Sequence, residues 1–193
     1  MIIFNLIFII WGVTCYIPNA GPELKSLCQP NTECSIDPQN LFGRWFEIAT
    51  TSQTAYNSYR CFRYSLRLPK SGVYTSGTRF KVKMSYMDLN STEFVRKVSV
   101  GQILDFPMLR LPTKRSSNDT FNIFTIKNIW VDQDGNYHRM LLMNSINDVE
   151  YLYIFARTRS ITFVEMAISK NSASILGFPP YKHVWNIADC EDY

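Results

Sequence analysis

Several features that common protein functions require are scarce or missing in this sequence of 193 residues. The two histidines, His138 and His183, stand apart, and no Cys-x-x-Cys pair occurs, so the sequence predicts no metal site. No arrangement of Ser, His and Asp and no close pair of carboxylates indicates an active site. We therefore expect neither catalytic residues nor a cofactor.

Long continuous runs of charge and internal repetition are missing too. The formal net charge is +4, and no run of basic residues is longer than Lys114-Arg115, which argues against nucleic acid as a partner. We find no internal repeat and no low-complexity segment. A chain of this length is long enough for one domain with a sizeable core and too short for two comfortable ones.

The one long apolar run, residues 2–13, is interrupted only by Asn5. As a helix it would span ~18 Å, which is short of the ~30 Å hydrocarbon core of a bilayer. Small residues at 14–15 and 19–20 offer two cleavage points. We predict a signal peptide at residues 1–20, a mature chain that begins between 16 and 21, and secretion of one domain, residues 21–193, without stable membrane insertion. Because no Lys or Arg precedes the run, a retained N-terminal anchor is the alternative.

Aromatic residues are abundant, at 15%, and apolar and polar residues alternate in many segments. Alternation predicts strands that are buried on one face, and the absence of helical spacing between them predicts antiparallel neighbours. This is typical of an up-and-down β-barrel or a sandwich. The predicted strands are 43–50, 59–68, 78–87, one around 98–102, 121–131, 137–143, 150–157 and 161–169, with a long loop at about 105–119 and a short helix within 174–186.

The alternation also predicts which side chains face the interior. Arg63, Arg67, Lys81 and Lys83 fall on the solvent side of their strands. The opposite, inward positions are the predicted ligand-binding residues: Phe62, Tyr64, Leu66, Phe80, Val82, Met84, Tyr86, Val98, Val100 and Gln102.

Two motifs resemble the lipocalin family. Gly43-Arg44-Trp45 opens a strand just after a turn-like segment, and Gly43 there permits a positive φ or a close backbone approach. The segment Tyr59–Tyr64, with Cys61 at its centre, is similar to the corresponding strand of apolipoprotein-D-like members. The resemblance covers most of the chain, from about Ser35 to Cys190. It implies an all-β, eight-stranded antiparallel barrel with a cavity for one small, mostly apolar ligand.

The resemblance also implies roles for particular residues. Trp45 would plug one end of the barrel, and an Arg near the end of the last strand would pack over it. By position that Arg falls within 167–170, where only Lys170 is basic, so Arg157 or Arg159 is the alternative. The second family motif, Thr-Asp-Tyr before the seventh strand, would fall near Ser145–Asp148.

Four cysteines remain after cleavage, and an even number in an exported chain predicts two disulfides with three possible connectivities. Many lipocalins link the second strand to the C-terminal tail. That precedent implies Cys61–Cys190, a disulfide-tied tail, and Cys28–Cys34 as the second pair. Two acceptor sequons, at Asn90 and Asn118, fall in predicted turns and predict glycosylation.

The predicted function is binding or transport of a small hydrophobic ligand, with the tyrosine hydroxyls and Gln102 orienting its polar end. Glu165 would face either solvent or a cationic ligand. A thiolate enzyme of the prostaglandin D synthase kind is not expected, because Cys61 is predicted to face outward and to have a partner. The alternative is a secreted interaction or inhibitor protein whose basic outer face meets an acidic partner protein or a membrane surface.

Overall fold

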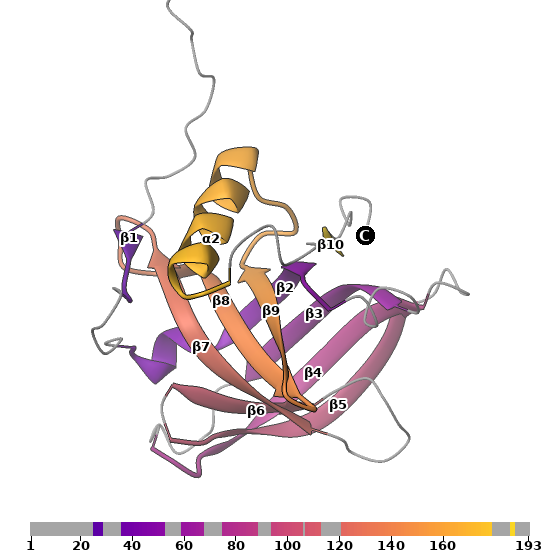
Figure 1. The fold of residues 1–193 in the computed structure, drawn as a ribbon. Coiled ribbons are helices and arrows are strands. Elements are labelled where there is room, and N and C mark those ends of the chain that lie inside the picture. Colours follow the sequence, from indigo (N-terminus) through magenta and orange to yellow (C-terminus); the bar gives the residue numbers. More distant parts are fainter. Residues whose placement is uncertain are drawn as a thin grey trace, which may run out of the picture.

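The computed structural model describes residues 25–28, 36–52, 59–67, 75–88, 94–105, 107–112, 121–178 and 186–187. Within them the chain forms one antiparallel sheet and one α-helix (Figure 1). Consecutive strands pair with each other, and the last of them closes the ring because β9 pairs with β2. The predicted eight-stranded up-and-down barrel is therefore confirmed. Its strands are β2 (Gly43–Thr50), β3 (Tyr59–Arg67), β4 (Arg79–Asp88), β5 (Phe94–Ile103), β6 (Met108–Pro112), β7 (Phe121–Val131), β8 (Tyr137–Ile146) and β9 (Val149–Ala156).

Three short elements flank the barrel. The strand β1 (Lys25–Ser26) pairs with β7, and β10 (Asn186–Ile187) pairs with β2. The 3-10 helix η1 (Pro38–Leu41) leads into β2, and the Asp37 side chain caps it by accepting the N–H of Gln39. The predicted signal peptide, both sequons, Cys190 and Cys34, the predicted partner of Cys28, lie outside the described residues.

The predicted last strand, 161–169, is wrong. These residues belong to the helix α2 (Phe163–Ile175), which follows the barrel. Thr162 caps the helix and forms a reciprocal capping box with Glu165, so two backbone N–H groups are satisfied at its start. The helix ends before Gly177, whose φ is +94°. The predicted C-terminal helix is thus confirmed, but it begins at Phe163 rather than within 174–186, and residues 179–185 of that range lie outside the described part of the chain.

The eighth strand comes instead from the predicted loop at 105–119, which contains β6. Pro107 and Pro112 suggested a loop, but Pro112 stands at the last position of this strand. Leu109 and Leu111 are buried inside the barrel and Arg110 points out. Five residues give too few alternations to indicate a strand in the sequence.

Apolar side chains form two layers. One fills the barrel interior, and the other lies between α2 and the outer faces of β2, β7, β8 and β9. Figure 1 shows the helix lying against this side of the barrel. Strands under the helix are buried on both faces, so the alternation is lost in Tyr151–Ala156. The second layer contains Ile48, Ala49, Trp130, Leu141, Leu152, Ile154, Ala156, Met166, Ala173 and Phe178.

The predicted orientation of β5 is also wrong. Val98 and Val100 are 68% and 49% exposed, and Gln102 follows the same parity, so none of the three faces the interior. The buried positions are Ser99, Gly101 and Ile103. A Cβ on Gly101 would lie 2.6 Å from Phe80 Cε2, so only glycine fits under that ring. Side chains of β4, Phe80 and Val82, fill the interior beside Gly101. The inward β5 residues Ser99 and Gly101 are therefore small, and their sequence shows no apolar alternation.

Candidate binding site inside the barrel

One end of the barrel is closed by Trp45 and Arg157. The Trp45 ring is fully buried, and its Nε1–H donates to the carbonyl of Leu41 at 2.7 Å. The guanidinium carbon of Arg157 lies 3.7 Å from the centroid of that ring. Of the three basic residues considered for this contact, Arg157 is the one that makes it. The last barrel strand is β9 rather than 161–169, and Arg157 directly follows it. The contact thus comes from the end of the last strand, where the resemblance placed it.

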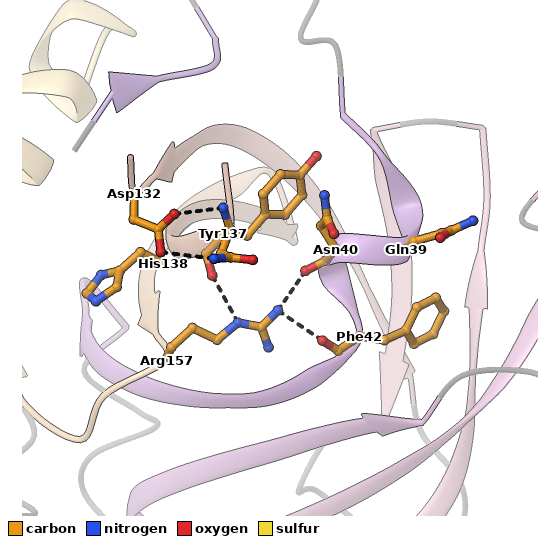
Figure 2. A pocket seen from close by; sticks show the side chains of 8 residues that line it. Gln39, Asn40, Phe42, Asp132, Tyr137, His138 and Arg157 are labelled. Atoms are coloured by element: carbon orange, nitrogen blue, oxygen red, sulfur yellow. Dashed lines mark hydrogen bonds between the residues drawn. The ribbon is translucent and has the colours of Figure 1, made fainter. Parts of the chain in front are cut away.

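The Arg157 guanidinium is held by backbone carbonyls (Figure 2). Its Nε donates to Tyr137 O at 3.0 Å, Nη1 to Arg44 O at 3.0 Å, and Nη2 to Asn40 O at 2.6 Å and to Phe42 O. Burial lowers the pKa of this side chain to about 10. These bonds join η1, the entry of β2 and the start of β8, so Arg157 has a structural role.

Gly43 is required at this end for two reasons. Its φ is +112°, and a Cβ built on it would lie 2.9 Å from Arg157 Nη1. The interpretation of Gly43 from the sequence, as a position of unusual φ or close approach, is thus confirmed on both counts.

The segment before the seventh barrel strand is Asp132–Asn136, because that strand is β8. The placement of the second motif at Ser145–Asp148 is therefore wrong. Asn147 and Asp148, with φ of 50° and 61°, form the tight turn between β8 and β9. Asp132 instead accepts the backbone N–H of Asn136 at 2.8 Å, and this bond lowers its carboxyl pKa.

A pocket of about 370 Å³ opens at the closed end (Figure 2). The backbone bonds described above already engage its charged groups, Asp132 and Arg157. We therefore assign it to the structure of the closed end. It is lined by Gln39, Asn40, Phe42, Asp132, Asn136, Tyr137, His138 and Arg157.

The barrel interior contains seven of the ten predicted ligand-binding residues. These seven are buried in one apolar cluster, and aromatic contacts connect several of them, such as the stacked pair Phe62 and Tyr86 with ring centroids 5.3 Å apart. Tyr153 and Phe155 of β9 and Phe124 of β7 extend the aromatic lining. The seven are Phe62, Tyr64, Leu66, Phe80, Val82, Met84 and Tyr86.

A carboxylate that the sequence reading missed also faces the interior. Glu47 is only 4% exposed, and it shares the inward face of β2 with Trp45, two residues earlier. Burial raises the pKa of the Tyr64 and Tyr153 phenols, and the Glu47 charge raises both further. The strand parity set by Trp45 was the signal that could have identified Glu47.

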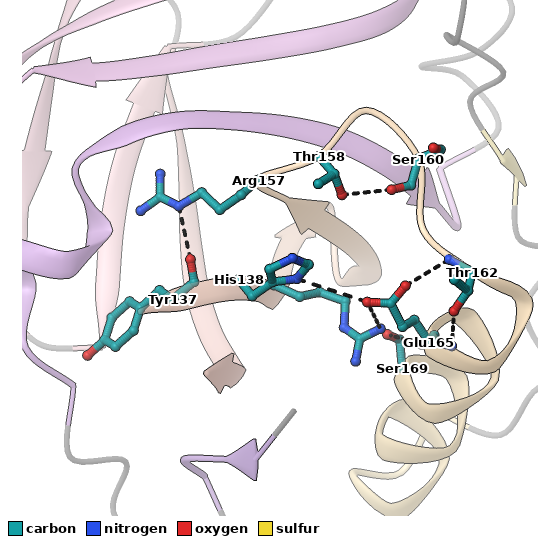
Figure 3. Close-up of polar contacts among 9 residues, drawn as sticks. Tyr137, His138, Arg157, Thr158, Ser160, Thr162, Glu165 and Ser169 are labelled. Carbon is teal, nitrogen blue, oxygen red and sulfur yellow. Dashed lines mark hydrogen bonds and ion pairs between the residues drawn. The ribbon is translucent and has the colours of Figure 1, made fainter. Parts of the chain in front are cut away.

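Glu165 was considered as the acidic ligand contact, and the structure places it elsewhere. It lies on α2, outside the barrel, where its Oε2 accepts the N–H of Thr162 and its Oε1 is 4.0 Å from both His138 Nδ1 and Arg139 Nη1 (Figure 3). Arg139 is fully buried and its guanidinium carbon is 4.6 Å from the Trp130 ring centroid. Glu165 therefore attaches the helix to the barrel.

Cys61 sits at a β-bulge in β3, with a φ of +58° and an exposed fraction of 6%. It is not a member of the interior cluster. Cys28 and Cys61 are both disulfide-bonded, but which cysteine each one pairs with stays a prediction. Among the described residues no three His, Cys, Asp or Glu side chains form a metal cluster, and no described helix is long and apolar enough to cross a membrane.

Comparison with known proteins finds similarity only in structure. No family model matches the sequence, and no curated protein matches it. Insecticyanin from the tobacco hornworm Manduca sexta superposes with a TM-score of 0.57 at 12% identity, over 89% of this chain and 91% of that one. Lobster apocrustacyanin A1 gives 0.57 at 13%, over 80% and 81%. The cockroach allergen Per a 4 gives 0.53 at 13%, over 84% and 94%. The fold is thus that of the lipocalins, an eight-stranded barrel followed by one helix.

Proposed function

We propose that this protein binds or transports a small apolar or amphipathic molecule inside the barrel. The observation that carries the proposal is the composition of the interior, in which aromatic and aliphatic side chains surround one carboxylate, Glu47. Small-molecule sites in proteins are typically apolar with a few placed polar groups that fix orientation. We propose no catalytic role.

The Glu47 carboxylate indicates which kind of ligand would bind. Burying a carboxylate costs free energy unless a cation or hydrogen-bond donors face it. The phenols of Tyr64 and Tyr153 supply neutral donors near Glu47, since their raised pKa keeps them protonated. A ligand with a protonated amine on an apolar or aromatic body fits this arrangement. A fatty acid does not, because its carboxylate would meet a like charge.

The first experiment looks for a bound molecule. Native mass spectrometry and organic extraction of the protein from its source should show a co-purifying small molecule. An apolar fluorescent probe should bind the wild type and Arg63→Asp, whose side chain faces outward, but not Tyr64→Asp. Circular dichroism controls for folding. Equal probe binding by both variants would contradict a site in the interior.

Secretion is part of the proposal, since the apolar run at residues 2–13 is too short to span a bilayer. N-terminal sequencing of the native protein should find a first residue between 16 and 21. An intact Met1 on a secreted form would contradict the signal peptide.

We also propose that Asn90 or Asn118 carries a glycan, so glycosidase treatment should shift the gel mobility of the native protein.

The proposed disulfides are Cys61–Cys190 and Cys28–Cys34, supported by the bonded state of Cys28 and Cys61. The first closes most of the chain and should stabilise it by roughly 4–5 kcal/mol in the chain-entropy model. Non-reducing peptide mapping tests the pairing. A peptide that joins Cys28 or Cys34 to Cys61 would leave the tail untied.

A further inference from the structure

Among the residues that the structure describes, the outer face of β2–β5 carries basic side chains and no acidic ones. Six of them are exposed, and two, Arg63 and Lys83, are half-buried. Among the described outward side chains of these four strands, none is Asp or Glu, since Glu47 faces inward. We call this set the basic face: Arg44, Arg63, Arg67, Arg79, Lys81, Lys83, Arg96 and, just after β9, Arg159.

Strand register places these cations in rows across the barrel. Arg63 is paired with Phe46 on one side and with Ser85 on the other, and Ser85 is paired with Arg96. The guanidinium carbon of Arg159 lies 5.9 Å from the Phe46 ring centroid and extends this row. Neighbouring strands are about 4.8 Å apart, so adjacent cations of a row are about 5–10 Å apart.

Two further rows run parallel to this one. Each row is displaced by two residues, about 6.7 Å along the strands, from the row before it. In one, Arg44 and Lys83 flank Ser65. In the other, Arg67 is paired directly with Lys81. Like charges this close repel each other. The pKa of Arg63 is lowered mainly by burial, and repulsion from the charges of Arg44, Arg159 and Arg96 lowers this pKa further.

The helix α2 does not cover this face. It packs over β7, β8 and β9 (Figure 1) and reaches β2 only at Ile48 and Ala49, beyond the Arg44 end of that strand. A closed barrel is convex on its outside, so a planar membrane would touch only part of the rows. Single-stranded nucleic acid binds through exposed aromatic platforms. The described outward side chains of β2–β5 include only one aromatic, the half-buried Phe46.

We infer that the basic face binds a sulfated polysaccharide chain. A flexible linear polyanion can follow the rows around the curved surface, which neither a membrane nor a rigid partner does. Six of the eight cations are arginines, whose planar fork matches the oxygen pairs of sulfate and carboxylate groups. Continuous Lys/Arg-rich stretches are known polyanion and heparin sites, and here strand pairing rather than a continuous stretch brings the cations together.

Heparin binding tests the inference, measured by titration calorimetry on the full chain at about 0.15 M salt. The test variant replaces three exposed cations of the face, Arg67→Gln, Lys81→Gln and Arg96→Gln. The control replaces three lysines elsewhere, Lys25→Gln, Lys127→Gln and Lys170→Gln. Both variants lower the formal net charge from +4 to +1, since 20 − 3 basic residues remain against 16 acidic ones. The dissociation constant should rise about tenfold or more in the test variant and less than about threefold in the control.

Three results would overturn the inference. An equal loss in both variants would mean that heparin responds only to net charge. Tighter binding of a poly-dT oligonucleotide or of phosphatidylserine vesicles than of heparin would assign the face to another anion. If the wild type does not bind heparin but the triple variant Asp189→Asn, Glu191→Gln and Asp192→Asn does, the occupant of the face would be the chain's own acidic C-terminal segment. Probe binding in the barrel interior is measured separately, so the two proposals can fail independently.

Discussion

The inner and outer faces of β2–β5 differ in chemistry although the same four strands form both. Among the described residues, the apolar side chains inside surround one carboxylate, and the outward side chains of the four strands include many cations and neither Asp nor Glu. Successive strand residues point to opposite faces, so a single residue step separates the two environments. The interior therefore governs stability and the proposed ligand, whereas the exterior governs the proposed polyanion.

The largest contrast between the two faces should appear in neighbouring truncations. Phe62 is 1% exposed and stacks on Tyr86, so Phe62→Ala should lower the free energy of unfolding by about 3–5 kcal/mol. Arg63→Ala should change it by no more than about 0.5 kcal/mol, since it removes a half-buried, outward-facing charge that neighbouring arginines repel. Urea unfolding measures both. Similar losses in the two variants would contradict the assigned orientation of β3.

A second pair tests the corrected orientation of β5. Gly101→Ala should destabilise by about 1–3 kcal/mol, because the added methyl group meets Phe80 and Val82 at under 3 Å. Val100→Ala, one residue earlier and half exposed, should be close to neutral. Thermal unfolding of the two variants decides the matter. A neutral Gly101→Ala together with a costly Val100→Ala would restore the alternation read from the sequence.

The interior should also limit stability at high pH. Burial, and then Glu47, raise the Tyr64 pKa above its ordinary value of 10.0, so above pH 10 the unfolded chain loses a proton that the folded protein retains. Stability is thus complete below pH 10 and falls as pH rises above it, by up to about 1.4 kcal/mol per pH unit for each such tyrosine. Tyr64→Phe should make this decline shallower in urea unfolding between pH 9 and 11. An unchanged slope would mean that the phenol is not shielded.

Most of the long barrel strands could be predicted from sequence patterns. The predicted bounds 43–50 and 121–131 agree with β2 and β7, and those of β3 and β4 agree to within about one residue. The failures have physical causes. The short β6 ends in a proline, α2 begins at a capping box inside an apolar run, and the small β5 residues face in because Phe80 and Val82 fill the space.

The site was predictable to a similar extent. Seven inward residues followed from alternation on β3 and β4, where large apolar side chains mark one face. Glu47 was missed because the motif around Trp45 drew attention to the aromatic residue, although strand parity places both on the inner face. Arg157 could be fixed only once β9 was known to be the last barrel strand, because the contact joins segments more than a hundred residues apart.

The central claim is that the interior recognises a ligand through Glu47. Titration calorimetry with tryptamine and with its neutral analogue tryptophol tests it most directly, on the wild type, on Glu47→Gln and on Glu150→Gln, whose side chain is exposed on β9. We predict that Glu47→Gln weakens tryptamine by about tenfold or more and leaves tryptophol unchanged, while Glu150→Gln affects neither. Equal weakening of both ligands, or wild-type binding that does not distinguish the amine from the alcohol, would contradict the account.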